Sequence, residues 1–327
     1  FGIGTAGNSN GTIQNNLVGW TGQGGIVFGG SAAWTLSGNE IESAGQGFAF
    51  ADGLGATGSC DLTATGNLIR NSAGFGISVV GSGTRIFENN SVIGNGLAGS
   101  ELANVYAKTV NTTVRKNIIE NAPGPGVSVP PLIVNARITQ NHFVNNGGTS
   151  IDLIASGGTL TDEREGDGIQ LNGGAGPCGI DAGAGNNGTD YPVITSAIYS
   201  AGNTRIRGTA CPASTIEFYR ANAGAGDLDI NGDPHGEGEI YVGDGPVNGA
   251  GNFDVTLPGF LATDTISAIV IDSTGNTSEF SVNRVNLEEL TMVKRSFLPD
   301  GTPIASGASL PVGLEFRFLL YIDNKSS

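Results

Sequence analysis

The residue types best suited to chemistry gather in one short acidic stretch, Asp-Leu-Asp-Ile-Asn-Gly-Asp at 227–233. Oxygen-bearing side chains at every second position can converge on one cation, and Gly232 permits the sharp turn that such a loop requires. The pattern predicts a calcium site, with an acidic hairpin loop that holds no ion as the alternative. The predicted calcium ligands are Asp227, Asp229, Asn231, Asp233 and Glu237.

This stretch resembles the calcium loops of EF-hand and dockerin proteins, but it departs from their pattern. The twelfth position is Gly238, with Glu237 and Glu239 on either side, so the bidentate glutamate is out of register. Helical flanks are not expected. A second set of candidate oxygen ligands lies in the junction that follows the repeats, where solvated loop acids are the alternative. These residues are Asp162, Asp167, Asp181 and Asp190.

Few residues are suited to catalysis. The chain has two histidines, His142 and His235, and no Ser-His-Asp arrangement or nucleophile elbow is recognisable. Alternation directs His142 outward, as an exposed side chain. The first half has no adjacent pair of aspartates of the kind that hydrolyses glycosides, and its basic residues are scattered. We therefore expect that the protein is not an enzyme.

Composition and charge exclude several classes of partner. The 327 residues include 30 acidic and 15 basic ones, for a formal net charge of −15. Such a chain is not suited to the phosphate backbone of nucleic acids, and it favours bound cations or a salty exterior. No apolar run approaches the ~20 residues of a membrane-spanning helix, so we expect no membrane insertion. The 55 glycines, without a collagen period, indicate a turn-rich β protein.

The three cysteines, Cys60, Cys178 and Cys211, are too few for a disulfide framework. The sequence leaves two possibilities: Cys178 and Cys211 form one disulfide bond, or they are buried free thiols. Phe1 begins directly in repeat-like sequence, which we interpret as a processed N-terminus or the start of the ordered part.

One phrase recurs about every 25 residues in the first half of the chain. An asparagine is followed two positions later by an apolar residue, and the intervals between these asparagines are 23, 28, 23, 27 and 24. Another short apolar piece follows in each unit, and in the second unit it is expected at Phe48 and Phe50. Period-2 alternation and Gly, Asn or Ser turns indicate strands, and a fixed strand–turn period indicates the coils of a solenoid. The repeat asparagines are Asn16, Asn39, Asn67, Asn90, Asn117 and Asn141.

These asparagines have a structural interpretation. At a bend the side chain can bond the nearby backbone, and amides stacked in register can bond from coil to coil. A ligand groove is the alternative. The phrases GNLIRNSAGFGISV, ENNSVIGNG, KNIIENAPGPGVSV and QNHFVNNGGTSIDL resemble the right-handed parallel β-helix repeat family, the surface-protein relatives of pectate-lyase-like solenoids. The resemblance covers residues 10–153 and implies a fold rather than an activity.

The second half predicts a β-sandwich. Seven short alternating pieces between 193 and 286, separated by turns, are typical of an immunoglobulin-like domain. IDSTGNTSEFSV at 271–282 resembles the last hairpin of bacterial Ig-like modules. The order of solenoid, junction and sandwich resembles that of large bacterial surface proteins.

The tail predicts two more strands around a Pro/Gly turn and resembles the opening of a surface-protein repeat module. An exposed apolar strand near its end would remain unpaired in this chain, and it is a candidate for strand addition to another subunit. The predicted assembly residues are Phe316, Phe318, Leu320 and Ile322.

We therefore predict an all-β chain with a right-handed parallel β-helix at 1–155, a capping junction at 156–192, an Ig-like β-sandwich at 193–286 and tail strands at 287–327. The expected function is structural and extracellular or at the cell surface: a subunit of a self-assembling layer, sheath or filament, or an adhesin stalk. Expected partners are further copies, other surface proteins or a polysaccharide, with calcium as the cofactor. The alternatives are a carbohydrate-active β-helix enzyme, such as a polysaccharide lyase or hydrolase, and a glycan-binding module.

Overall fold

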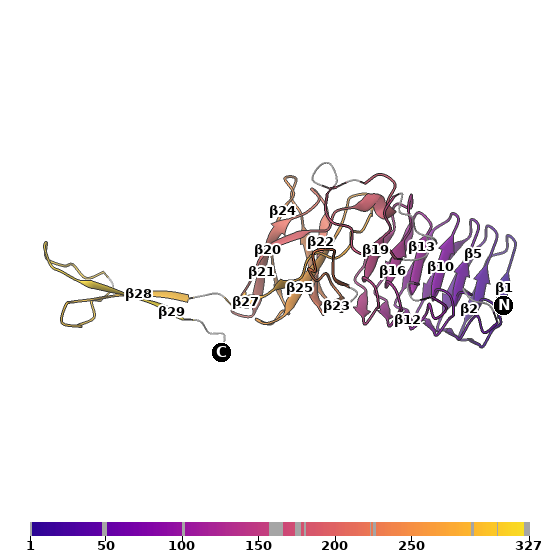
Figure 1. Cartoon of the computed structure of the whole chain (residues 1–327), viewed down its shortest axis with the longest axis horizontal. Coiled ribbons are helices and arrows are strands. Elements are labelled where there is room, and N and C mark those ends of the chain that lie inside the picture. Colours follow the sequence, from indigo (N-terminus) through magenta and orange to yellow (C-terminus); the bar gives the residue numbers. More distant parts are fainter. Residues whose placement is uncertain are drawn as a thin grey trace.

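The computed structural model describes residues 2–47, 51–99, 102–156, 166–173, 178–179, 181–222, 224, 227–288, 291–305 and 307–323. Within these ranges the chain is all β apart from one 3₁₀ turn, η1 (Gly185–Gly188). Figure 1 shows a solenoid, a sandwich and a hairpin in a row along the long axis, with the N-terminus at the far end of the solenoid.

The solenoid is formed by three parallel sheets, because each coil contributes one short strand to each of them. Sheet A consists of β1 (Ile3–Thr5), β4 (Ile26–Phe28), β7 (Leu54–Ala56), β10 (Ile77–Val80), β13 (Val105–Lys108), β16 (Val127–Val129) and β19 (Ile151–Leu153). Sheet B consists of β2 (Gly11–Gln14), β5 (Ala33–Ser37), β8 (Asp61–Thr65), β11 (Arg85–Glu88), β14 (Thr112–Arg115) and β17 (Arg137–Thr139). Sheet C consists of β3 (Leu17–Gly19), β6 (Glu40–Glu42), β9 (Leu68–Arg70), β12 (Ser91–Ile93), β15 (Ile118–Glu120) and β18 (His142–Val144).

The interior of the solenoid is filled by apolar side chains stacked in register. In sheet A, Ile77 lies between Leu54 and Val105 of the adjacent coils, and all three are fully buried. Alternate residues of each short strand point inward, so a coil buries its apolar side chains only against its neighbours. The predicted solenoid architecture is confirmed.

The repeat asparagines form a continuous ladder of amides inside the solenoid. The side-chain oxygen of Asn90 accepts the backbone N–H and the side-chain amide of Asn67, each at 2.9 Å, and its own amide donates to the carbonyl of Ala64 at 2.9 Å. The same contacts recur from Asn16 to Asn141. The structural interpretation of these residues is therefore confirmed, since the amides satisfy backbone groups at bends that are buried from Asn39 to Asn141, with Asn16 at the exposed start of the ladder.

The second coil differs from the sequence prediction in the position of one strand. Its sheet A strand is β7, at Leu54–Ala56, and not at Phe48 and Phe50, which lie outside the described residues. The second unit is 28 residues long, and its extra residues precede the strand. The fourth unit, 27 residues long, is built the same way, with extra residues ahead of β13.

The sandwich consists of two four-stranded sheets that enclose a second apolar core. Sheet D consists of β24 (Asn252–Pro258), β21 (Asn203–Thr209), β20 (Val193–Ser200) and β27 (Leu287–Glu288). Sheet E consists of β23 (Gly238–Pro246), β22 (Thr215–Ala221), β25 (Thr265–Ile271) and β26 (Arg284–Val285). Ile206 and Phe253 of sheet D meet Phe218 and Ile266 of sheet E in the core.

The last of the seven strands predicted between 193 and 286, SEFSVNRV at 278–285, is reduced to β26, at Arg284–Val285. The residues ahead of it turn instead toward the solenoid. Thr277 pairs with Ile271 only through an isolated β-bridge. Its hydroxyl oxygen accepts the backbone N–H of Ile138 at 2.9 Å. A contact with the solenoid thus replaces a regular strand.

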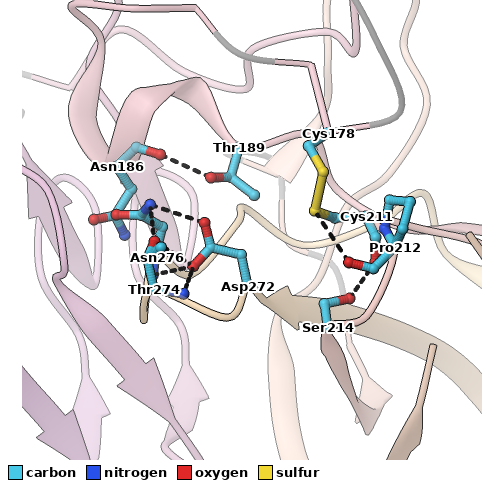
Figure 2. The surroundings of a disulfide bond; sticks show 9 residues. All are labelled: Cys178, Asn186, Thr189, Cys211, Pro212, Ser214, Asp272, Thr274 and Asn276. Atoms are coloured by element: carbon cyan, nitrogen blue, oxygen red, sulfur yellow. Dashed lines mark hydrogen bonds between the residues drawn. A yellow bond between two sulfur atoms is a disulfide. The ribbon is translucent and has the colours of Figure 1, made fainter. Parts of the chain in front are cut away.

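A disulfide bond joins Cys178 of the junction to Cys211, which lies just before β22 of the sandwich (Figure 2). Cys60 is free and buried in the solenoid. The disulfide bond therefore links the junction to the segment that leads into sheet E. Of the two possibilities left by the sequence, the bridge is the one that the structure contains.

The tail forms an antiparallel hairpin of β28 (Thr291–Phe297) and β29 (Arg317–Asp323), with Ser296 opposite Phe318. The prediction that the last strand would stand alone in this chain is wrong, because β28 supplies its partner. The hairpin projects away from the sandwich (Figure 1). No helix in the described ranges has the length and apolarity needed to cross a membrane.

Candidate functional site

The end of the solenoid meets the sandwich through buried glutamates. A parallel solenoid ends in strands whose backbone groups lack a further coil, and such an edge must be covered. Glu217 of β22 covers the end of sheet B: its carboxylate accepts the hydroxyl of Thr139, the backbone N–H of Gln140 at 3.0 Å and the hydroxyl of Tyr219 at 2.6 Å.

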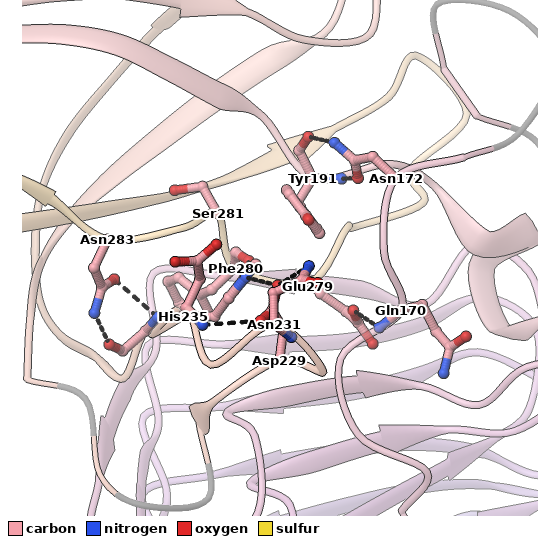
Figure 3. A network of polar contacts seen from close by, with 12 residues as sticks. Gln170, Asn172, Tyr191, Asp229, Asn231, His235, Glu279, Phe280, Ser281 and Asn283 are labelled. Atoms are coloured by element: carbon pink, nitrogen blue, oxygen red, sulfur yellow. Dashed lines mark hydrogen bonds and ion pairs between the residues drawn. The ribbon is translucent and has the colours of Figure 1, made fainter.

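Two more glutamates cover the other two sheets. Beside sheet C, Glu237 accepts the backbone N–H of Asn145, together with the backbone N–H and the side-chain amide of Asn146 at 2.7 and 3.0 Å. At sheet A, Glu279 accepts the backbone N–H of Leu153 at 3.0 Å and that of Gln170 at 2.8 Å (Figure 3). Each sheet of the solenoid therefore ends on one carboxylate of the sandwich.

Neutral side chains complete this cap. Asn276 accepts the backbone N–H of Asn135 at 2.7 Å. Asn186 of η1 accepts the backbone N–H of Ala136 at 3.0 Å and donates to the carbonyl of Thr277 at 2.9 Å. The loop that contains Asn276 is itself held by Asp272 (Figure 2). The junction, the sandwich and the last coil thus share one network of hydrogen bonds.

Burial changes the acidity of these carboxyl groups. Burial raises the pKa of Glu217 and of Glu237, although the hydrogen bonds that each accepts act in the opposite direction. For Glu279, burial raises the pKa to about 8, against the hydrogen bonds from Leu153 and Gln170.

A second acidic group lies beside this cap. Asp152, in the middle of β19, is fully buried, and its carboxyl group lies beside Asp167 and the backbone of Gly168. Burial raises its pKa well above the ordinary range, and the charges of Glu279 and Asp167 act in the same direction. Asp167 accepts the backbone N–H of Ala155 at 2.9 Å through its Oδ2 atom. A neutral, protonated Asp152 is the form that this environment favours.

A cavity of about 260 Å³ opens next to Glu279, between the last coil and the junction. Its walls include Leu153, Gln170, Asp181 and Asp190. Burial raises the pKa of Asp190. Asp181 accepts the hydroxyl of Ser156 at 3.2 Å. Of the junction acids named above as candidate ligands, Asp162 lies outside the described residues.

The predicted calcium ligands are directed to different partners. Asp227 is buried, accepts the backbone N–H of Gly224 at 2.6 Å, and has a pKa raised by burial to about 8. Asp229 accepts the backbone N–H groups of Asn231 and Asp233, at 2.8 and 2.9 Å, through one oxygen.

Glu237, the fifth predicted ligand, faces the solenoid and not the loop, as its contacts with Asn145 and Asn146 show. Within the described part of the chain, no group of three or more His, Cys, Asp or Glu side chains is arranged to hold a metal ion. Calcium binding therefore stays a prediction.

Both histidines lie at the seam between solenoid and sandwich. His142 is half exposed, its Nδ1 contacts the backbone carbonyl of Glu239, and its Nε2 lies 3.3 Å from Glu120. The expectation of a simply exposed side chain missed this contact. His235 is buried, with Nδ1 2.8 Å from the carbonyl oxygen of Phe280 and Nε2 3.6 Å from Asp229 (Figure 3).

Along the side of the solenoid, charges form local pairs. Arg70 of β9 lies 2.8 Å from Glu40 and 3.2 Å from Glu42 on the adjacent strand β6. Arg115 lies 2.7 Å from Glu88 on sheet B. These exposed pairs join neighbouring coils, and each contributes ~0–1 kcal/mol.

The hairpin carries the predicted assembly residues on one face. Phe316, Phe318 and Leu320 alternate along the chain, and they are 43, 49 and 60% exposed. The Phe316 and Phe318 rings meet edge to face at 4.8 Å, and the Lys294 ammonium lies 3.8 Å from the centre of the Phe318 ring. The backbone of Ile322 belongs to β29, and its side chain is outside the described part.

Sequence reasoning missed Glu217, Glu279 and Asp152. The available signal was an acidic residue inside an otherwise apolar piece, as in STIEFYRA and SIDL. The side chain of such an acidic residue is buried when the alternation of the strand points it into the protein, and a buried carboxyl group requires a hydrogen-bond partner.

Comparison with known proteins agrees with this architecture. A family model described as a right handed beta helix region matches residues 1–165. The chain therefore belongs to the family of proteins with a right-handed β-helix region.

One solved structure gives a weak likeness: the full-length tailspike protein 2 from the Escherichia coli O157:H7 bacteriophage CAB120. It shares 10% identity with the chain at a TM-score of 0.20, and the match covers 86% of this chain and 50% of that one. The chain thus spans about half the length of that protein, and a likeness at this TM-score carries no argument. No curated protein sequence matches the chain.

Proposed function

We propose that the protein is a structural component of an extracellular or cell-surface assembly, in which the capped solenoid is a rigid spacer and the terminal hairpin makes contact with another copy. In this proposal the sandwich is an Ig-like module. The observation that carries the proposal is the hairpin, which exposes Phe316, Phe318 and Leu320 together on one face.

Two physical arguments support assembly through this hairpin. An isolated two-stranded hairpin is at best marginally stable in water, and a third strand or a covering surface stabilises it. β29 pairs on one side with β28, and its other edge has no partner within the described residues. That edge has backbone groups to add to a further strand. Head-to-tail contacts of this kind need not close into a ring, so they can build filaments or layers.

The experiment compares the association state of the wild type and of a Phe318→Asp/Leu320→Asp double variant by sedimentation velocity over a range of concentrations. The wild type is expected to gain mass with concentration, while the double variant stays monomeric. Val312→Asp, at an exposed position between the two strands, is the matched control and is expected to assemble like the wild type. A wild type that stays a monodisperse monomer at high concentration contradicts the proposal.

Calcium is part of the proposal as a stabiliser of the acidic loop at 227–233. A bound ion stabilises the folded state by mass action. We expect a higher melting temperature with calcium than with chelator, and this gain is expected to disappear in Asp227→Asn/Asp229→Asn. Equal melting temperatures with calcium and chelator would remove the ion from the proposal.

A further inference from the structure

The chain has one Asp–Pro peptide bond, Asp233–Pro234, and it lies in the turn at 227–235 beside the capped end of the solenoid. An aspartate side chain can reach its own backbone carbonyl carbon through a five-membered ring. This proximity replaces a bimolecular attack with an intramolecular one. The nitrogen of proline is a tertiary amide without N–H, which makes it a better leaving group once it takes up a proton. The bond thus has a built-in nucleophile and a favourable leaving group.

The turn activates the carbonyl group of this bond. The carbonyl oxygen of Asp233 accepts the backbone N–H of Asp229 at 3.0 Å. As the carbon becomes tetrahedral, this oxygen gains negative charge, and a fixed N–H donor stabilises that charge. The backbone N–H of Asp233 donates to the Asp229 carboxylate at 2.9 Å, so Asp233 is held in place. Its own side chain is exposed and accepts no hydrogen bond from the described residues, so it can rotate toward the carbonyl carbon.

The chain after the bond is anchored separately. Pro234 forms an isolated bridge with Leu228, and the backbone N–H of His235 donates to the carbonyl of Asp227 at 2.8 Å. The His235 imidazole is buried, 2.8 Å from the carbonyl oxygen of Phe280, and its ring meets that of Tyr191 edge to face at 4.8 Å (Figure 3). The Asp233–Pro234 bond therefore spans two fixed points, and Asp233 between them is an exposed residue.

We propose that the protein cleaves its own chain between Asp233 and Pro234. A carboxylate oxygen of Asp233 attacks its own carbonyl carbon, the bond from this carbon to the Pro234 nitrogen breaks, and that nitrogen takes a proton from water. The products of this step are a cyclic anhydride at Asp233 and a new N-terminal proline. A second attack, by water on the anhydride, restores two carboxyl groups, so the net reaction is hydrolysis of one peptide bond and needs no other reactant.

Cleavage would leave the fold intact. It gives fragments 1–233 and 234–327, and the second has 94 residues (327 − 233). β22 of the first fragment pairs with β23 and β25 of the second. Glu237 and Glu279 of the second fragment also bind the last coil of the first. The disulfide lies entirely within the first fragment and does not join the two. The cut protein is therefore expected to keep its native size and to separate only in denaturant.

The test follows the full chain by intact mass spectrometry during incubation at a fixed, mildly acidic pH. Two fragments are expected, whose masses sum to the parent plus one water, with a new N-terminus at Pro234. Hydroxylamine is expected to trap the anhydride as a hydroxamate on Asp233. Because one oxyanion donor is typically worth ~10²–10³ in rate, the folded chain is expected to react roughly a hundredfold faster than the same chain in guanidinium chloride.

Matched variants sharpen this comparison. Asp233→Ala removes the nucleophile and is expected to abolish both the fragments and the hydroxamate. Asp300→Ala alters another exposed turn aspartate and is expected to cleave like the wild type. An uncut folded chain would overturn the proposal, and so would a denatured chain that is cut as fast as the folded one.

Discussion

Glu237 of the sandwich and Asn146 of the solenoid are 91 residues apart in sequence, yet one carboxylate oxygen of Glu237 accepts both the backbone N–H and the side-chain amide of Asn146. This contact extends a second row of stacked amides, separate from the ladder that ends at Asn141, in which Asn95 donates to Asn104 at 2.9 Å and Asn104 donates to Asn146 at 3.4 Å. Asn146 also donates to the carbonyl of Ile119 of the preceding coil at 3.1 Å. The sandwich thus takes the place of a further coil at this point.

Truncation of this contact tests the strength of the cap. Glu237→Ala leaves the buried backbone N–H of Asn146 and the part-buried backbone N–H of Asn145 without their acceptor, and a buried group left in this way costs about 1–3 kcal/mol. We expect the free energy of unfolding, measured by denaturant titration, to fall by about 2–5 kcal/mol. Glu239→Ala, at a half-buried position in β23, is the control and is expected to change it by less than about 0.5 kcal/mol, because the substitution keeps the backbone carbonyl that contacts His142. Equal effects of the two substitutions would contradict the assigned role of Glu237.

The asparagine ladder predicts an effect that depends on position. Asn90→Ala removes the acceptor for two groups of Asn67 and the donor to Ala64, all of them buried. We expect a loss of about 2–4 kcal/mol in the free energy of unfolding. At Asn16, in the exposed first coil, alanine is expected to cost about 1 kcal/mol or less. Circular dichroism during chemical unfolding measures both, and similar losses at the two positions would argue against a ladder whose strength comes from burial.

The disulfide predicts a redox-dependent stability. Cys178 and Cys211 are 33 residues apart, and closing a loop of this length stabilises the folded state by about 3–4 kcal/mol in the chain-entropy description. Reductant is expected to lower the unfolding midpoint of the wild type to that of the Cys178→Ser/Cys211→Ser variant. The same reductant is expected to leave the variant unchanged. A wild-type midpoint that does not respond to reductant would show that the bond is absent in solution.

The solenoid could be predicted from the sequence because its information is local and repeated. Asn67 and its counterparts occur at nearly constant intervals, and the apolar residues around them alternate as strands do. The cap could not be predicted, because its partners share no pattern. Glu217 bonds Gln140 across 77 residues, and only the presence of an acid between Ile216 and Phe218 hints at a buried partner.

The calcium prediction shows a related limit of sequence reasoning. Alternating oxygens at 227–233 satisfy the spacing of a metal loop, but the fold uses Asp229 to hold the turn and Glu237 to cover the solenoid. Spacing along a chain reports which side chains are neighbours. It does not report which distant backbone groups compete for them.

The buried acids beside the cap predict that stability falls as pH rises. The pKa of Glu279 is about 8 in the folded chain and that of Asp152 is also raised, whereas both are ordinary when unfolded. The folded state therefore binds more protons than the unfolded state between about pH 4.5 and pH 8, and the free energy of unfolding decreases across that window. The contribution of these groups is fully present below about pH 4.5 and is lost as pH rises through the folded pKa.

Asp152→Asn tests the sign of this effect, because the amide has the shape of the protonated carboxyl group and does not ionise. The variant is expected to match the wild type at about pH 4, and to be more stable than the wild type at about pH 8. Guanidinium chloride titrations at several pH values measure the two curves. Glu315→Gln, at an exposed acid of the hairpin, is expected to run parallel to the wild type. If the Asp152→Asn curve also ran parallel to it, Asp152 would not hold a proton in the folded chain, and a cation or bound water would have to satisfy its two buried oxygens.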